Sequence, residues 1–383
     1  MRVSRRGAVD PFIVMDVMEA ARTLEEAGRR IIHMEVGQPG TPAPAGAREA
    51  LARAMEAGPL GYTGALGLPE LRQGIAALYH RWYGVDLDPN RVVVTAGSSS
   101  AFLLAFSALF DAGERVALGE PGYPSYRQIL RALSLEPVGI ASSPENRLQP
   151  VPADLAGVAD LAGLIVASPG NPSGTMLSHE ALAALIHHAQ ARDIAFISDE
   201  IYHGLDYGTR AVSALEISDE VYVINSFSKY FSMTGWRLGW LVVPEAHVRL
   251  VERLAQNMFI CPPHASQVAA LAALDCLPEL EANRAVYAEN RRLMIEGLPK
   301  AGFTSFAPPD GAFYIYADVS ALTDDSLALS AEILREAGVA ATPGLDFDPV
   351  RGKHTLRFSY ARSTADITEG LRRLQEWMAR RGR

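Results

Sequence analysis

The chain has 383 residues, 49% hydrophobic and 21% charged, and its net charge of −9 without a lysine-rich tract argues against nucleic acid as the main partner. Its two cysteines, Cys261 and Cys276, lack the spacing of metal ligands, so the sequence predicts neither a zinc site nor a disulfide framework. The basic start precedes an apolar run too short for a signal peptide, and no stretch approaches ~18 apolar residues, so we expect a cytoplasmic protein without a membrane partner.

The first predicted element is a helix that begins at Asp10-Pro11, because aspartate can cap a helix and proline fits its first position. This helix would run to about residue 27, with Gly28 ending it. A short strand at 31–36 then leads into a passage rich in glycine and proline, 37–46, which is a candidate linker between domains.

From residue 68 onward, segments with helical spacing alternate with short apolar runs. The helical segments include 68–80, 98–110 and 179–192, and the apolar runs are 92–95, 116–119, 164–167, 195–198, 221–224 and 241–243. This pattern predicts an α/β fold, in which helices cover both faces of a mostly parallel sheet. Ligands of such sheets bind outside the carboxyl ends of the strands, and the polar clusters of interest follow predicted strands.

The C-terminal part has a different pattern. A helical block at 264–298 precedes predicted strands at 313–319, 339–342 and 355–360 and helices at 326–336 and 364–380. This order indicates a smaller α+β domain. We therefore expect an N-terminal segment, 1–43, that packs with the small domain, a large domain at 44–276 and a small domain at 277–383.

One segment combines a lysine with hydroxyl groups and an arginine. Lys229 follows Ser226 closely after the apolar run 221–224, and Arg237 lies eight positions further on. A buried lysine is costly unless its charge is removed or paired, and a lysine that forms a Schiff base with a carbonyl cofactor becomes chemically useful. Serine hydroxyls and an arginine would make a phosphate socket. The alternative is a strand followed by an ordinary basic loop.

Three further polar clusters lie in loops or at a helix start, next to the predicted strands and helices. Ser98 and Ser99 stand at a predicted helix start, where backbone N–H groups bind phosphate or where a serine caps the helix. Tyr123 lies between a glycine and a proline, so its ring could stack on a flat ligand or belong to a plain turn. Asn171 stands in the rigid loop 168–175, which suits either a preorganised site or a routine Asn-Pro turn.

Two charged residues belong to apolar strands. Asp199 ends one of them, where its carboxylate needs a partner such as a protonated heteroaromatic nitrogen, unless it caps a helix. Tyr202 follows three residues later and could share the ligand. Arg357 in the strand 355–360 indicates a guanidinium that meets a carboxylate or phosphate, or one that reaches solvent from an edge strand.

In this order these clusters resemble the fold type I, pyridoxal-phosphate-dependent aminotransferases of class I and II, which are similar to aspartate aminotransferase. The resemblance extends from Gly37 to Arg357 and implies pyridoxal 5'-phosphate as the cofactor. It implies that Lys229 forms a Schiff base with the cofactor and moves the proton, that Asp199 pairs with the pyridinium nitrogen, and that Tyr202 is a third catalytic residue. The resemblance assigns to the cofactor Ser98, Ser99, Tyr123, Asn171, Asp199, Tyr202, Ser226, Lys229, Arg237 and, from the other subunit, Tyr62.

The resemblance also implies how the substrate is bound and how the chain assembles. Arg357 would bind the substrate α-carboxylate together with Asn171 and the backbone of Gly37. Because Tyr62 would complete the phosphate socket of its partner, a homodimer with active sites at the interface is implied. After Pro343-Gly344, where many relatives continue with Phe-Gly, this chain has the seven residues 345–351.

Acidic residues in that loop bear on substrate choice. Asp346 and Asp348 could disfavour a second substrate carboxylate, whereas Arg351 and Lys353 could offset them. A further arginine for a dicarboxylate could be Arg127 or Arg131. The preference between mono- and dicarboxylates is open at this point.

The leading hypothesis is an aminotransferase that moves an amino group between an α-amino acid and a 2-oxo acid by a ping-pong mechanism. A pyridoxal-phosphate-dependent C–S β-lyase with the same fold is the alternative. A remote third possibility is the effector-binding domain of a transcription regulator, which should carry an N-terminal DNA-binding module. We expect no such module, because the predicted enzyme begins within the first dozen residues.

Overall fold

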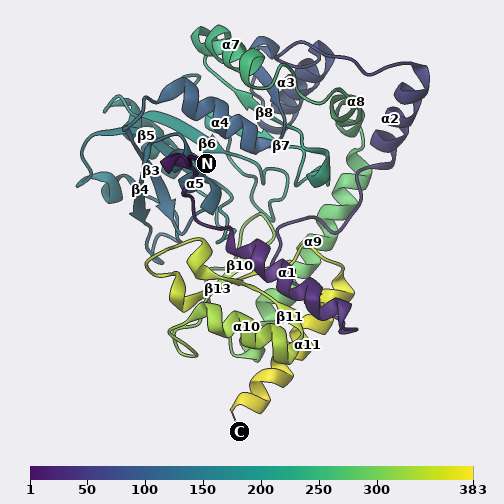
Figure 1. Ribbon diagram of the computed structural model, residues 1–383, viewed down its shortest axis with the longest axis vertical. Coiled ribbons are helices and arrows are strands. Elements are labelled where there is room, and N and C mark those ends of the chain that lie inside the picture. The colour runs from purple at the N-terminus through teal and green to yellow at the C-terminus, as the bar shows by residue number, and fades with distance from the viewer. Residues whose placement is uncertain (383) are drawn as a thin grey trace.

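The computed structural model describes residues 1–382, and its larger part is built on one seven-stranded sheet (Figure 1). The strands in spatial order are β2 (Val92–Thr95), β8 (Gly239–Val242), β7 (Tyr222–Ser226), β6 (Ala195–Asp199), β5 (Leu161–Ala167), β3 (Arg115–Glu120) and β4 (Glu136–Ala141). Only β8 runs antiparallel to its neighbours. The prediction of a mostly parallel sheet is therefore confirmed.

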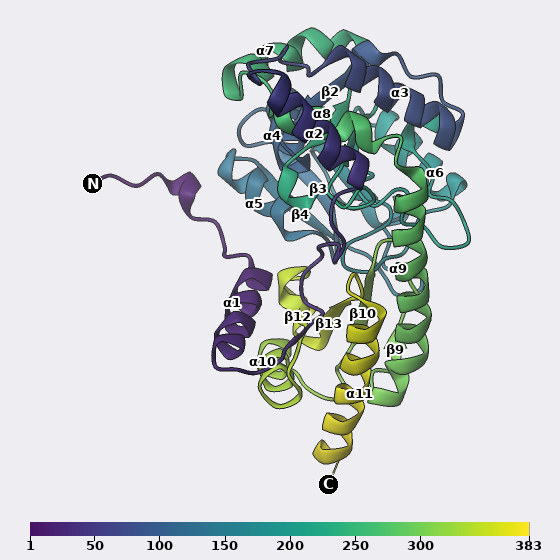
Figure 2. The same ribbon diagram turned by 90° about the vertical axis from the view of Figure 1, so that its right-hand side faces the viewer.

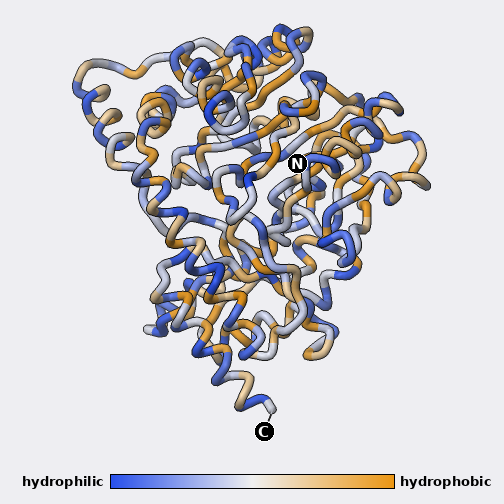
Figure 3. Tube along the Cα trace, turned by 180° about the vertical axis from the view of Figure 1, so that it is seen from behind, coloured by the Kyte–Doolittle hydropathy of each residue, from blue (hydrophilic) through white to orange (hydrophobic). Residues whose placement is uncertain are grey.

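Helices lie on both faces of this sheet, as the two orthogonal views show (Figures 1 and 2). The helices of the larger part are α2 (Ala45–Ala57), α3 (Pro69–Tyr83), α4 (Ser98–Leu109), α5 (Pro124–Ala132), α6 (His179–Gln190), α7 (Val248–Met258) and α8 (His264–Ala273), of which α2 packs on α8 at the periphery and not on the sheet. Because both faces are covered, the central strands are mostly apolar and buried, as in the Leu-Ala-Gly-Leu-Ile-Val-Ala of β5. Hydrophobic stretches accordingly run through the interior (Figure 3).

The smaller part contains a four-stranded antiparallel sheet in the order β12-β13-β10-β9. These strands are β12 (Thr342–Pro343), β13 (Thr355–Ser359), β10 (Tyr314–Asp318) and β9 (Ser305–Phe306). Around it lie α1 (Ile13–Glu26), α10 (Ser326–Ala337) and α11 (Thr364–Arg381), and β1 (Ile32–His33) pairs with β11 (Val339–Ala340). The long helix α9 (Leu277–Gly297) runs from the larger part into the smaller one (Figure 1).

Short 3-10 helices complete the fold. They are η1 (Arg5–Gly7), η2 (Pro89–Arg91), η3 (Pro152–Leu155), η4 (Ala214–Glu216), η5 (Thr234–Trp236), η6 (Glu245–His247), η7 (Pro299–Ala301), η8 (Gly344–Asp346) and η9 (Gly352–His354). Among the described residues, no helix combines the length and the hydropathy needed to cross a membrane. The domain boundaries at residues 43 and 276 stay a prediction.

Several predicted boundaries were wrong. The first helix begins at Ile13 rather than at Asp10-Pro11, because the carboxylate that caps it comes from Asp346. The helical block at 264–298 is confirmed, and it consists of two helices that a turn between Ala273 and Leu277 separates. The candidate linker 37–46 ends inside α2, and the strand predicted at 339–342 is divided between β11 and β12.

Candidate active site

A cavity of about 200 Å³ lies where the carboxyl ends of β6 and β7 face the smaller part of the molecule. Nine residues that the sequence singled out line it: Gly37, Ser98, Ser99, Tyr123, Asn171, Tyr202, Lys229, Arg237 and Arg357. They come from widely separated segments of the chain. The fold thus gathers in one place most of the residues that the sequence pattern assigned to one site.

Lys229 lies just after the end of β7 and is partly buried. Its Nζ donates a hydrogen bond to the Gly37 carbonyl oxygen, with 2.6 Å between the two atoms. Burial and the positive charges of Arg357 and Arg237 lower the pKa of Lys229 to about 8. About a tenth of this amine is therefore neutral at pH 7, far more than for an ordinary lysine, and the neutral form can act as a nucleophile or base.

Asp199 ends β6, the strand next to β7, and is only 2% exposed. Its carboxylate accepts hydrogen bonds from the Tyr126 hydroxyl and, at 3.1 Å, from the Ile201 backbone N–H. Burial raises the pKa of Asp199 to about 6, because these hydrogen bonds and the positive Lys229 offset the desolvation only in part. A ligand that brings a positive charge beside Asp199 would complete that compensation.

One end of the cavity is built to receive an anion. Helix α4 starts at Ser98 after Gly97, which has no side chain to cap the free N–H groups of the first turn. A Cβ atom on Gly97 would lie 2.5 Å from Nη2 of Arg237, so glycine is what allows the guanidinium to approach the helix start. Free N–H groups, serine hydroxyls and a guanidinium together suit a phosphate.

Ser226 contributes to that end differently from the expectation. It is buried, and its hydroxyl donates to the Leu238 carbonyl oxygen at 3.1 Å and lies 2.8 Å from the Ser228 hydroxyl. Ser228 lines the cavity, whereas Ser226 does not. Ser226 therefore supports Ser228, to which the resemblance had assigned no role although it lies next to Lys229.

The other end of the cavity holds a guanidinium. Arg357 of β13 is 3% exposed, and its Nη1 donates to Oδ1 of Asn171 at 2.9 Å. The guanidinium carbon lies 4.4 Å from the centre of the Tyr314 ring and 4.6 Å from that of Phe347. Its Nη2 donates to the Glu35 carbonyl oxygen and its Nε is buried without a hydrogen-bond partner, so the protein does not satisfy every donor of this cavity-lining guanidinium.

Aromatic side chains line the middle of the cavity. The Tyr202 hydroxyl lies 2.7 Å from that of Tyr314, which the sequence reasoning had not placed in the site. Tyr123 meets the ring of Phe12 edge to face, at 5.9 Å between centroids. A Cβ atom on Gly37 would lie 1.7 Å from the Tyr314 hydroxyl, which explains why glycine stands there.

Tyr62 lies outside the cavity of its own chain and is 82% exposed. Its segment is held by His264, whose ring nitrogen lies 2.9 Å from the Gly61 carbonyl oxygen. The apolar side chains of Met55 and Ile260 are exposed as well. In this chain alone, therefore, Tyr62 does not reach the other predicted site residues.

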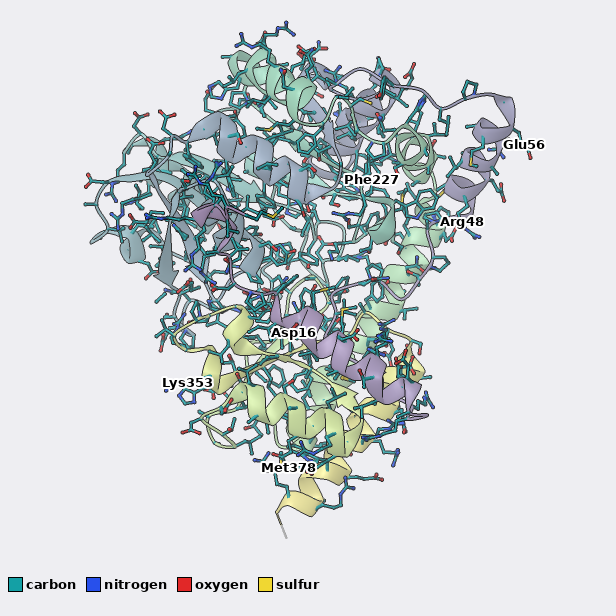
Figure 4. All side chains as sticks on the ribbon, viewed as in Figure 1. Asp16, Arg48, Glu56, Phe227, Lys353 and Met378 are labelled. Carbon is teal, nitrogen blue, oxygen red and sulfur yellow. The ribbon has the colours of Figure 1, made fainter. Side chains whose placement is uncertain are left out.

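The candidate arginines for a second substrate carboxylate have partners elsewhere. Arg127 pairs with Glu120 at 2.6 Å, and Arg131 pairs with Asp10 at 2.6 Å. Lys353 is exposed at the surface (Figure 4). None of these basic side chains lines the cavity.

Asp346 and Asp348 also have structural roles. Asp346 caps α1, and the Asp348 carboxylate accepts a hydrogen bond from Nε of Arg351 at 2.6 Å. Neither carboxylate is free to repel a substrate at the entrance, and Arg351 is engaged as well.

The lowered pKa of Lys229 can be tested by chemical labelling of the protein without cofactor. The chain has only three lysines, Lys229, Lys300 and Lys353, so each labelled peptide can be assigned by mass spectrometry. We expect acylation of Lys229 to rise with pH to half its maximum near pH 8, because only the neutral amine reacts. A midpoint for Lys229 near that of an ordinary lysine, pH ~10.4, would contradict the account of this site.

Comparison with known proteins bears on this site. Residues 29–374 match the family model of the class I and II aminotransferases. The chain is 48% identical to the valine–pyruvate aminotransferase of Mycobacterium tuberculosis over 98% of both chains. It is 71% identical to a solved putative aminotransferase from Silicibacter pomeroyi, with a TM-score of 0.95 and coverage of 99% and 100%. Thermus thermophilus aspartate aminotransferase with maleate is 31% identical, with a TM-score of 0.92 and coverage of 98% and 100%.

These relatives are named for transamination, which supports that reaction and not the C–S β-lyase alternative. The match covers nearly all of this chain and of each relative, so it includes the elements that build the cavity. The chain is an enzyme that transfers amino groups between amino acids and oxo acids, and it belongs to the class I and II aminotransferases.

Proposed function

We propose that this aminotransferase uses pyridoxal 5'-phosphate, bound in the cavity at the carboxyl ends of β6 and β7. Members of its family generally depend on this cofactor. The donors at the start of α4, with Arg237 and Ser228, suit its phosphate. Asp199 suits its ring nitrogen, and Asn171 and Tyr202 suit its phenolic oxygen. Tyr123 would stack on the ring.

The observation that carries this proposal is the position of Lys229. Its amine faces the cavity between the donors at the start of α4 and Arg357, and its pKa is lowered to about 8. When bound, pyridoxal phosphate supplies a carbonyl that condenses with amines and a ring that accepts electrons from the substrate Cα.

The chain's own residues would then divide the work. Lys229 would take the proton from the substrate Cα at its Nζ and return it at a different carbon. Asp199 would keep the ring nitrogen protonated through its negative charge. Arg357, helped by Asn171 and the backbone of Gly37, would orient the substrate by its α-carboxylate.

For the substrate, we propose amino acids with apolar side chains, with pyruvate as an acceptor. A relative that is 48% identical is named a valine–pyruvate aminotransferase. In this chain Phe12, Val14 and Met15 line the cavity, whereas Arg127 and Arg131 pair with other carboxylates. An apolar wall leaves a second carboxylate without a partner, and this costs binding energy.

Single half-reactions with a panel of amino acids test this proposal. We expect valine and alanine to convert the bound cofactor to its amine form with release of the oxo acid. We expect aspartate and glutamate to react with kcat/KM values on the order of 10²-fold lower, because their side-chain carboxylates would be desolvated without a partner. Faster reaction with aspartate than with valine would refute the substrate assignment, and release of ammonia instead of amine transfer would argue against transamination.

We further propose a homodimer in which Tyr62 of each chain completes the partner's phosphate socket. Tyr62 is 82% exposed, and the apolar side chains of Met55 and Ile260 are exposed as well, which supports contact with a second copy. Sedimentation equilibrium should give twice the chain mass, and an active monomer would contradict this arrangement. We also propose that the domains divide at residues 43 and 276 and that the enzyme is located in the cytoplasm.

A further inference from the structure

One carboxylate joins two segments at the substrate end of the cavity that are far apart in sequence. Oδ1 of Asp346 accepts a hydrogen bond from the Ile13 backbone N–H at 3.0 Å, and Oδ2 accepts one from that of Val14 at 3.2 Å. Asp346 is 4% exposed, so it is a buried cap supplied from the far end of the sequence. The local N-cap residue of α1, Phe12, has no polar side chain to take this role.

The first turn of α1 depends on this cap more than the rest of the helix does. Further along α1, Ala21 packs into a small separate core with Ile31, Leu334 and Ala340. The first turn lies outside that core and carries Phe12, Val14 and Met15 at the cavity. Figure 2 shows α1 on the outside of the smaller part, beside β12 and α10.

Asp346 also belongs to a turn that contacts the other walls of the substrate end. The next residue, Phe347, places its ring 4.6 Å from the Arg357 guanidinium carbon. The Phe347 carbonyl oxygen accepts a hydrogen bond at 3.0 Å from Gly122, the neighbour of Tyr123. The turn is internally fixed, because Gly344 accepts hydrogen bonds from Phe347 and Asp348. A rigid turn that holds Arg357 can therefore hold the start of α1 at a set distance from it.

We propose that Asp346 is a positioning residue for substrate specificity: it anchors the start of α1, so that Phe12, Val14 and Met15 form the wall against which the substrate side chain packs. The inference rests on the proposed apolar substrates. In this proposal Asp346 does not repel a second substrate carboxylate, since its own carboxylate faces the backbone N–H groups of α1 and not the substrate.

The test compares Asp346→Ala and Asp346→Asn with Asp325→Ala, which removes the N-cap of α10, a helix whose cap residue does not line the cavity. Wild-type kinetics are measured first: a wild-type enzyme inactive on valine and alanine would refute the proposed substrates and with them the specificity role, whereas hydrogen exchange tests the anchoring role in either case. In Asp346→Ala we expect the amides of Ile13 and Val14 to exchange hydrogen about fivefold faster, as loss of a cap implies.

In the same variant we expect kcat/KM for valine to fall about tenfold and that for alanine no more than about twofold, because valine alone reaches the wall with its two extra methyl groups. Asp346→Asn, which keeps one acceptor oxygen, should lie between, and Asp325→Ala should leave the valine-to-alanine ratio unchanged. Faster exchange with an unchanged ratio would overturn the specificity role. Unchanged exchange at Ile13 and Val14 would overturn the anchoring role.

Discussion

Replacing Lys229 with alanine is expected to reduce transamination by about 10⁴-fold, because the substitution removes both the amine that condenses with the cofactor and the base that moves the proton. The amine donates only one hydrogen bond, to Gly37, so the variant should fold. Steady-state turnover with valine and pyruvate measures the effect, and circular dichroism checks the fold.

The exposed Lys300 provides the matched control, since Lys300→Ala removes the same side chain at the surface. That variant should keep wild-type turnover. If Lys229→Ala retained more than about one hundredth of the activity, another group would have to move the proton, and the role given to Lys229 would be wrong.

The second large effect is expected at Asp199. Asp199→Ala and Asp199→Asn should both lower kcat on the order of 10²–10³-fold, because each removes the negative charge that keeps the ring nitrogen protonated. Cofactor affinity should change far less, since the phosphate end of the cavity is intact. With α-deuterated valine, a primary isotope effect larger than that of the wild type should appear as Cα–H cleavage becomes slower.

The asparagine variant separates charge from packing, because it keeps the size of the side chain and an acceptor for the Ile201 N–H. Tyr126→Phe is the companion: it removes the O–H that donates to Asp199 and keeps the carboxylate. It should lose less than about tenfold, the scale of one hydrogen bond. Near-normal turnover of Asp199→Asn would show that the charge is dispensable.

The central strands could be predicted because a strand that is buried on both faces of a sheet appears in the sequence as a continuous run of apolar residues. The edge strand β4 escaped this reasoning, since it contains Pro137 and Gly139 and most of its residues are partly or fully exposed. The start of α1 was also beyond local rules. Its cap, Asp346, is 333 residues away from Ile13 in the sequence, and no local sequence pattern predicts such a contact.

The same distinction explains the site. Asp199 and Lys229 follow neighbouring parallel strands, so the topology alone brings them together. Tyr126 and Tyr314 approach the site from α5 and β10, and only the tertiary structure shows their contacts with Asp199 and Tyr202. Arg127 looked available in the sequence, but its ion pair with Glu120 depends on how α5 packs against β3.

The central claim, that Lys229 is the residue to which pyridoxal phosphate attaches, can be measured directly. The enzyme is incubated with pyridoxal phosphate, reduced with borohydride and digested, and the peptides are weighed by mass spectrometry. Since the chain has three lysines, the assignment is unambiguous. We predict one pyridoxyl phosphate group per chain, on the peptide that contains Lys229. A label found only on Lys300 or Lys353, or on no lysine, would contradict the account.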